Sequence, residues 1–224
     1  MASPTTTYTL ALLLCLATLW VMPLPSHCAD PDPLQDFCVA DMKATPPVSG
    51  FPCKPADMVA AADFISDALL RPGNTDNVFK SAVTQGNAVT FPGLNTLGIA
   101  LNRVDFAVAG LNPPHSHPRA TEAGFVLEGK FLIGFVTSNN TLFSNVVHPG
   151  QMFVFPRGLV HFQRNIGKGK GLILTAFNSQ NAGVDIIPTT LFASNPPIPD
   201  FVLSQTFQIN DKLVEEIRGG LANA

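Results

Sequence analysis

Three histidines and one glutamate are the residues of this 224-residue sequence best suited to chemistry. His115 and His117 are separated by a single residue, and a β-strand places such residues on the same face. Glu122 follows shortly after them, and His161 comes from a distant part of the chain. Three neutral imidazoles and one carboxylate suit manganese, iron, zinc or copper, and their spacing does not choose among these metals.

The other interpretation of these residues is a set of polar surface side chains beside a proline turn, but the neighbouring sequence favours a metal site. Residues 110–122 read Gly-Leu-Asn-Pro-Pro-His-Ser-His-Pro-Arg-Ala-Thr-Glu and are followed by Gly129, and this stretch resembles the first cupin motif in its germin form. The second cupin motif is matched, at its usual spacing, by Gly150, Pro156, Gly158, His161 and Asn165. Because two separate motifs agree, the chain resembles the germin family of the cupin superfamily.

The resemblance to germins covers nearly the whole chain, since residues 30–41, 177–181 and 195–199 also look like germin segments. It implies a single jelly-roll β-barrel, a homohexamer built as a trimer of dimers with interlocking C-terminal helices, and a location in the plant apoplast or cell wall. It further implies a Cys38–Cys53 disulfide and Mn²⁺ as the cofactor. The implied Mn²⁺ ligands are His115, His117, Glu122 and His161.

One position departs from the family pattern. The first motif usually has glycine where this chain has Ala109. Gly110 follows it directly, so we expect the turn to survive with a small local change.

Two asparagines bear on the activity. Asn102 is the only polar residue on a strand face that it shares with Ala100, Val104 and Phe106, and a lone amide on an apolar face needs a partner. That partner is either the backbone or a ligand in the metal cavity. Asn112 precedes two prolines and is equally explained as a turn residue. By resemblance, both asparagines align with the substrate-contacting residues of germins that oxidise oxalate.

The elements that position these residues are predicted to be mainly short β-strands. Runs rich in Val, Ile, Leu and Phe that end at Gly, Pro or Asn are typical of an all-β sandwich or barrel. Examples are residues 96–108, 123–127, 130–136, 152–155 and 171–178. Apolar residues at helical spacing predict a short helix within 57–70 and an amphipathic C-terminal helix, whose stripe must cover either the barrel or another subunit.

We therefore expect four parts along the chain. They are a signal peptide (1–28), an N-terminal arm with the disulfide (29–85), one cupin β-barrel (86–208) and the C-terminal helix (209–224). The apolar run at residues 10–20 is too short to span a bilayer, and Ser26 and Cys28 fit a cleavage site; an uncleaved anchor is the alternative. The protein is thus expected to be secreted, with no membrane association after cleavage.

Cysteine and asparagine chemistry agree with an extracellular location. Cleavage leaves Cys38 and Cys53, which most simply pair in an oxidising compartment, and a cysteine metal site is disfavoured because no histidine lies near them. Asn139 begins a glycosylation acceptor sequence that otherwise forms an unmodified polar turn.

The net charge of −3 gives no basic field for nucleic acid. The combination of 13% charged and 46% hydrophobic residues indicates an oligomer.

Three functions fit such a chain. In the first, oxalate or a related carboxylate binds the metal, Asn102 and Asn112 orient it, and dioxygen accepts electrons to yield peroxide and carbon dioxide. In the second, superoxide reduces and reoxidises the metal by turns. In the third, the ion is structural and the hexamer is a wall, storage (nutrient reservoir) or receptor-like protein. We favour a defence-related manganese protein that generates peroxide, because a structural site is ordinarily closed to further ligands. Arg119 fits either charge neutralisation at the barrel mouth or an ion pair with another subunit, and stays unassigned.

Overall fold

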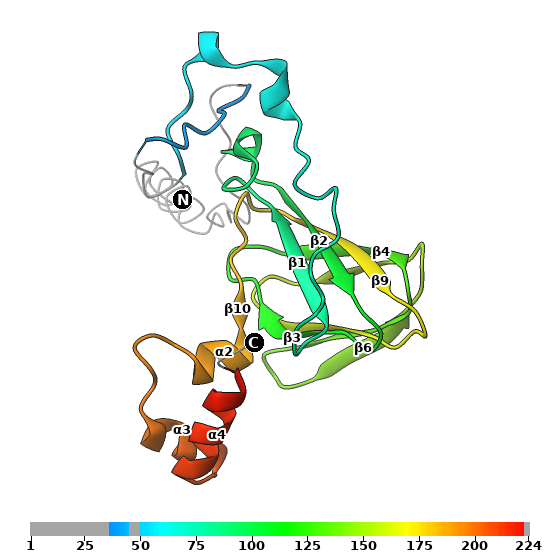
Figure 1. Cartoon of the computed structure of the whole chain (residues 1–224), viewed down its shortest axis with the longest axis vertical. Helices are drawn as coiled ribbons and strands as arrows, with labels where there is room; N and C mark the ends of the chain where they lie inside the picture. Colours follow the sequence, from blue (N-terminus) through cyan, green and yellow to red (C-terminus); the bar gives the residue numbers. More distant parts are fainter. Residues whose placement is uncertain (1–35, 45–49, 222–224) are drawn as a thin grey trace, which may run out of the picture.

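The computed structural model describes residues 36–44 and 50–221, and in this part of the chain two five-stranded antiparallel sheets face each other as a jelly-roll barrel (Figure 1). The sheet orders are β1-β2-β9-β4-β7 and β10-β3-β8-β5-β6. The strands are β1 (Ser81–Gly86), β2 (Ala100–Phe106), β3 (Leu111–Ser116), β4 (Glu122–Glu128), β5 (Phe131–Val136), β6 (Leu142–Val147), β7 (Met152–Phe155), β8 (Val160–Asn165), β9 (Gly171–Phe177) and β10 (Asp185–Ile186). The all-β fold predicted from the short apolar runs is confirmed. The expected signal segment 1–28 lies outside the described residues.

The strands occupy a range that differs from the expected barrel bounds of 86–208. They begin at Ser81 and end at Ile186, and helices follow directly. The first strand, β1, was missed because its six residues, Ser-Ala-Val-Thr-Gln-Gly, include only two apolar side chains. It pairs antiparallel with β2 along its whole length, with Val83 opposite Val104.

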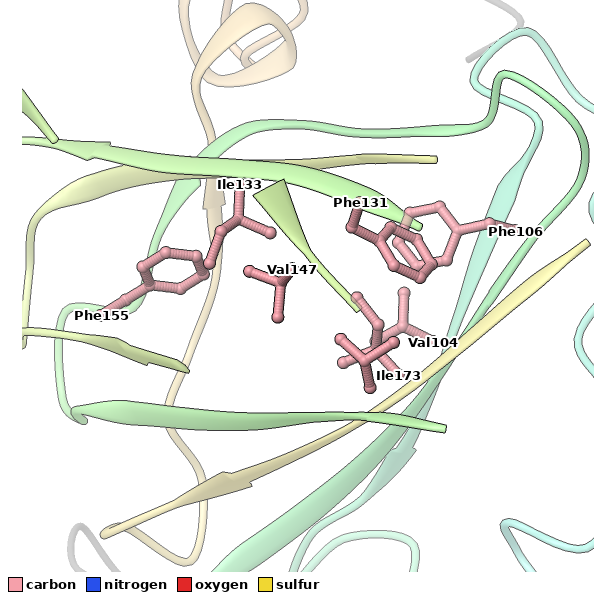
Figure 2. Packing of buried hydrophobic residues seen from close by; sticks show 8 residues of the cluster. Val104, Phe106, Phe131, Ile133, Val147, Phe155 and Ile173 are labelled. Atoms are coloured by element: carbon pink, nitrogen blue, oxygen red, sulfur yellow. The ribbon is translucent and has the colours of Figure 1, made fainter. Parts of the chain in front are cut away.

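The main core fills one end of the barrel. Alternate residues of the strands point inward, and side chains from both sheets meet there (Figure 2). The buried cluster consists of Val104, Phe106, Val126, Phe131, Ile133, Val147, Phe155 and Ile173. The rings of Phe106 and Phe131 pack edge to face with centroids 4.8 Å apart. Burial of each such ring stabilises the fold by roughly 2–3 kcal/mol, so this cluster holds the two sheets in register.

The N-terminal arm does not contain the helix expected within 57–70. Two short 3₁₀ turns, η1 (Ala56–Met58) and η2 (Ala61–Phe64), stand in its place, and Val59 and Ala60 between them have extended backbones. Asp63 accepts the backbone N–H of Ala60 at 2.8 Å, which starts a new turn instead of continuing the first. Much of the apolar stripe is exposed, since Met58 is 62% and Ile65 is 74% exposed. Without burial of that stripe, a helix of this length is only marginally stable.

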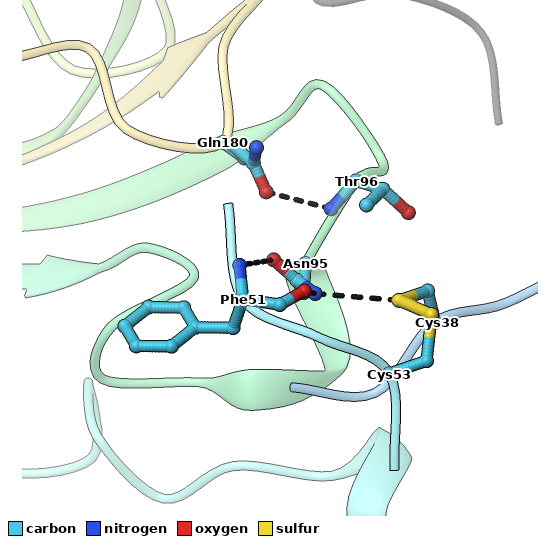
Figure 3. The surroundings of a disulfide bond; sticks show 6 residues. All are labelled: Cys38, Phe51, Cys53, Asn95, Thr96 and Gln180. Carbon is cyan, nitrogen blue, oxygen red and sulfur yellow. Dashed lines mark hydrogen bonds between the residues drawn. A yellow bond between two sulfur atoms is a disulfide. The ribbon is translucent and has the colours of Figure 1, made fainter. Parts of the chain in front are cut away.

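The disulfide between Cys38 and Cys53 closes a loop within the arm, and the backbone N–H of Ala40 donates at 3.0 Å to the carbonyl of Pro92 in a third short turn, η3 (Pro92–Leu94), which lies between β1 and β2. Asn95, which follows η3, is completely buried. Its amide donates to the carbonyl of Phe51 at 2.9 Å and to the sulfur of Cys38 at 3.4 Å, and it accepts the N–H of Phe51 at 3.3 Å (Figure 3). This single side chain therefore connects both sides of the disulfide loop to the segment that enters β2.

The chain ends in a group of three helices, α2 (Ile187–Phe192), α3 (Asp200–Phe207) and α4 (Asp211–Leu221), of which only α4 corresponds to the predicted C-terminal helix. Phe192, Leu203 and Val214, one from each helix, form a separate buried cluster. The apolar stripe of α4 thus covers α2 and α3 of its own chain, at the end of the molecule opposite the arm (Figure 1). None of the helices in the described residues is long and apolar enough to cross a membrane.

The turn before β3 survives the replacement of the family glycine. Ala109 has φ of +59°, in the left-handed region that glycine adopts without cost. Gly110 must be glycine for a different reason, because a Cβ there would lie 2.3 Å from the carbonyl oxygen of Lys80. The backbone N–H of Gly110 closes the turn on Ala107 at 3.0 Å, and Asn112 and His115 follow on β3.

Candidate metal centre

The four predicted ligands converge at the other end of the barrel interior. His115 lies on β3, His117 directly after it, Glu122 at the start of β4, and His161 on β8. All four are buried, with at most 6% of each residue exposed. The pairing of β3 with β8 places His115 opposite His161, although the register shifts after Asn112. Strand pairing thus brings together residues that are far apart in the sequence.

The distances among the ligand atoms are those of a metal site. One oxygen of Glu122, Oε2, lies 2.8 Å from Nε2 of His117 and 3.3 Å from Nε2 of His161. The candidate ligand atoms of all four residues lie within 4.8 Å of one another. Atoms bound about 2 Å from one ion lie roughly 3 to 4 Å apart, so small side-chain movements suffice for a common ion.

The three imidazoles are held in the tautomer that metal binding requires. Each Nδ1 lies against a backbone carbonyl oxygen: His115 against Pro113 at 2.8 Å, His161 against Leu159 at 2.8 Å, and His117 against Gly183 at 2.6 Å. A carbonyl can only accept a hydrogen bond, so each Nδ1 carries the proton. Each Nε2 therefore directs its lone pair towards the centre, as in histidine ligands whose other ring nitrogen donates to a carbonyl.

The electrostatics of the centre favour deprotonated ligands. Burial lowers the pKa of His115 to about 3, with a further contribution from the neighbouring His161. Burial alone would raise the pKa of Glu122, but the close contacts with the imidazoles of His117 and His161 outweigh it and lower the pKa to about 2. At neutral pH, His115 is thus neutral and Glu122 ionised, as a divalent cation requires.

Gln163 is a site residue that the sequence interpretation missed. Its amide donates to Oε1 of Glu122 at 3.0 Å, and its own oxygen accepts from Nδ2 of Asn112 at 2.7 Å. It is 1% exposed. The signal that could have found it is its position two residues after His161 on β8, which puts both side chains on one strand face. Gln163 occupies one carboxylate oxygen and leaves Oε2 for a metal ion.

The predicted asparagines border the same cavity as the ligands. A cavity of 290 Å³ is lined by three of the ligand residues together with Asn102 and Asn112. Asn102 shares the inward face of β2 with Ala100, Val104 and Phe106, as the alternation predicted. It is only 9% exposed, and within the described part of the chain its side-chain amide has no hydrogen-bond partner. An unpaired, nearly buried amide facing a cavity indicates a site for a polar ligand.

The donor set fits a divalent transition metal. Three imidazole nitrogens and one carboxylate oxygen keep a net charge of +1 on a dication and leave two positions of an octahedral ion open. The cavity is bordered by His115, His117 and Glu122 and by Asn102 and Asn112, so a ligand bound there would adjoin a metal held by this cluster. The site can therefore hold a metal and still admit a small anion.

Comparison with known proteins agrees with the fold. The family model described as "Cupin" matches residues 67–215. Germin-like protein subfamily T member 2 of Arabidopsis thaliana is 54% identical over 207 residues, 92% of this chain and 93% of that protein. Nectarin-1 of Nicotiana langsdorffii x Nicotiana sanderae is 53% identical over 194 residues, 87% of this chain and 84% of that protein. The solved structure of oxalate oxidase in complex with the substrate analogue glycolate has a TM-score of 0.84 and 47% identity, covering 86% of this chain and 98% of that one.

The double-sheet barrel with three histidines and a glutamate at one end defines this protein as a cupin. Within that class, the identities of about half the residues over most of the chain are decisive. The chain belongs to the plant germin-like proteins.

Proposed function

We propose that this chain is a secreted, manganese-binding germin-like protein that oxidises oxalate, or a closely related small carboxylate, and releases peroxide. The observation that carries the proposal is the unpaired amide of Asn102, which shares a cavity with the buried His₃Glu cluster. The similarity to an oxalate oxidase bound to glycolate supports it. When bound by His115, His117, Glu122 and His161, manganese supplies a redox-active cation with positions open to a carboxylate.

The residues of the chain bind and orient the substrate. Asn102 can donate and accept hydrogen bonds, and Asn112 keeps its oxygen free because only its Nδ2 is engaged by Gln163. The overall reaction takes one oxalate dianion, one dioxygen and two protons to two carbon dioxide molecules and one hydrogen peroxide. The carbon–carbon bond breaks, and its two electrons reduce dioxygen.

The experiment is expression of the secreted protein with manganese, measurement of its metal content, and separate assays of peroxide release from oxalate and from superoxide. Asn102→Ala should keep its manganese and lose about 10- to 100-fold in kcat/KM with oxalate, the range for a hydrogen bond to a charged group. Asn145→Ala is the matched control, because Asn145 is exposed on β6. Oxalate turnover that is unchanged in Asn102→Ala contradicts the role of the amide.

Superoxide dismutation is the second candidate, favoured by the same open cation. Dismutation of superoxide needs no shaped pocket for a carboxylate. Activity with superoxide and none with oxalate would therefore favour dismutation over oxalate oxidation. Inactivity with both substrates favours a non-enzymatic wall, storage or receptor-like protein, with a structural ion.

The proposal includes an apoplastic, defence-related role and a homohexamer built as a trimer of dimers. Large apolar side chains remain exposed in the single chain, among them Met152 at 72% and Phe201 at 68%, which supports burial between subunits. Asn139, the proposed glycosylation site, lies exposed in the hairpin turn between β5 and β6. Mass spectrometry before and after glycosidase treatment, and sedimentation of the secreted protein, test these two points.

A further inference from the structure

One of the three histidine ligands depends on a remote segment for its orientation. Nδ1 of His115 and of His161 each donates to the carbonyl two residues earlier in its own chain segment. Nδ1 of His117 instead donates to the carbonyl of Gly183, 66 residues away, at 2.6 Å. Gly183 belongs to residues 178–184, here called the mouth loop, which lines the cavity between β9 and β10. The position of His117 is therefore only as well defined as that loop.

Arg119 holds the mouth loop against the segment that carries His117. Its side-chain Nε donates to the carbonyl of Asn181 at 2.8 Å, and its backbone N–H donates to the carbonyl of Ala182 at 3.1 Å. The guanidinium group covers Gly183, where a Cβ would lie 2.8 Å from Nη2 of Arg119. Gly183 also has φ of +69°, so both backbone and space require glycine at the residue that orients His117.

The start of the loop is attached separately. The amide oxygen of Asn178 accepts the N–H of Thr121 at 2.8 Å. Gln180 accepts the N–H of Ala88 on its carbonyl at 3.0 Å and the N–H of Thr96 on its side chain at 2.6 Å (Figure 3). These contacts end at Gln180. The next two residues, Asn181 and Ala182, are held by the side chain and the backbone N–H of Arg119. Removal of the Arg119 side chain thus releases the carbonyl of Asn181 and uncovers Gly183, while the start of the loop and the backbone bond to Ala182 stay in place.

We propose that Arg119 is a positioning residue of the metal centre, which holds the mouth loop so that the carbonyl of Gly183 fixes the ring of His117. The sequence left open charge neutralisation at the barrel mouth or an ion pair with another subunit, and the structure shows the side chain bonded to a backbone carbonyl of its own chain. The proposal rests on the proposed metal binding. The planar guanidinium group bonds the loop through Nε and covers the glycine with its remaining atoms, and the single ammonium group of lysine cannot do both.

The test measures Mn²⁺ affinity, by competition with a chelator, for the secreted wild type, Arg119→Ala, Arg119→Lys and Arg164→Ala. Arg164 is an exposed arginine on β8 and controls for loss of charge. Arg119→Ala should bind about tenfold more weakly, the lower end of the range for changes to residues that orient a metal ligand, with an altered electron paramagnetic resonance spectrum of the bound ion. Arg119→Lys should resemble Arg119→Ala, and Arg164→Ala should match the wild type. The unfolding temperature of the metal-free protein should change by less than about 2 °C.

A second measurement uses the contact between Arg119 and Gly183. Gly183→Ala should also weaken binding, because its Cβ meets the guanidinium group. In the double variant of Arg119→Ala with Gly183→Ala, no guanidinium group meets the added Cβ. The fold-loss of Mn²⁺ affinity in the double variant should therefore be smaller than the product of the fold-losses in the two single variants. This cycle also serves if Arg119→Ala alone is poorly secreted.

Several outcomes overturn the proposal. They are unchanged Mn²⁺ affinity in Arg119→Ala, full recovery in Arg119→Lys, and a fall in metal-free stability large enough to account for the weaker binding. A wild type that binds no manganese removes the proposed function and this inference with it. A wild type that binds manganese, beside an Arg119→Ala variant that binds equally well, removes this inference alone.

Discussion

The amide of Gln163 donates to Oε1 of Glu122 at 3.0 Å, in the interior of the barrel. Because Oε1 is engaged in this way, Oε2 is the oxygen that faces His117 and His161. The same Gln163 accepts from Asn112, so one side chain joins the predicted metal centre to the predicted substrate site. The two sites are parts of one hydrogen-bonded unit.

Gln163→Met is therefore expected to weaken Mn²⁺ binding by about 10- to 100-fold, because the carboxylate loses the donor that fixes its orientation. The size of the side chain is nearly kept, so a cavity contributes little. Chelator competition measures the effect, and Gln205→Met, on the exposed surface of α3, is the control. Wild-type affinity in Gln163→Met would show that the carboxylate is held well enough by the histidines alone.

His161→Ala should abolish stable manganese binding, since it removes one of four ligands from a buried site. A metal present at 100 times its dissociation constant stabilises a protein by about 3 kcal/mol, which raises the unfolding temperature by roughly 5–10 °C at this chain length. Manganese should produce such a rise in the wild type and none in His161→Ala. His148→Ala, at an exposed histidine before a turn, should retain the full rise. A variant without His161 that still responds to manganese argues against this ligand set.

The fold and the ligand cluster could be predicted from the sequence because they depend on local patterns. Two-residue periodicity placed Asn102 on the inward face of β2, and the cupin motifs identified His115 and His161 although they meet only through strand pairing. The two motifs together indicate that β3 pairs with β8, and neither segment indicates this by itself. The disulfide could be expected because only Cys38 and Cys53 remain after residue 28.

Other features depend on tertiary contacts that no local pattern carries. The stripe that predicted a helix within 57–70 fails because it is largely exposed, with Met58 at 62% and Ile65 at 74%. The helices α2 and α3 are short and gain their stability from burial of Phe192 and Leu203 against α4. The role of Gly183 comes from its backbone carbonyl, so its residue type gives no direct sign of it.

The metal-free protein should lose stability as the pH falls below about 6.5. The pKa of His115 is lowered to about 3 from 6.5, so the unfolded chain takes up a proton there that the folded chain refuses. This contribution is complete above pH 6.5 and is lost as the pH falls towards 3. Glu122, whose pKa is lowered to about 2 from 4.5, adds a loss only below pH 4.5. Urea unfolding at pH 7.5, 6 and 5 should show a loss of about 1 kcal/mol per pH unit, which His115→Gln reduces. An equal slope in both proteins contradicts this assignment.

Replacement of both Cys38 and Cys53 by serine should lower the free energy of unfolding by about 3 kcal/mol, because a cross-link across 15 residues restricts the unfolded chain. Chemical denaturation of metal-loaded protein measures the change. The buried amide of Asn95 still holds Phe51 in the variant, so Mn²⁺ affinity should fall by less than stability does. Stability equal to the wild type would mean that the arm does not unfold together with the barrel.

Ala109→Gly should stabilise the protein by about 1 kcal/mol, since Ala109 has φ of +59° and an L-residue pays roughly 1–2 kcal/mol in the left-handed region. Part of this gain is offset because glycine makes the unfolded chain more flexible. The control is Ala176→Gly in β9, where the backbone is extended and glycine should destabilise by about 0.5–1 kcal/mol. Opposite signs for the two changes in urea unfolding are expected. If Ala109→Gly also destabilises, the turn does not adopt the left-handed conformation in solution, and the chain has adapted to the missing family glycine by another backbone path.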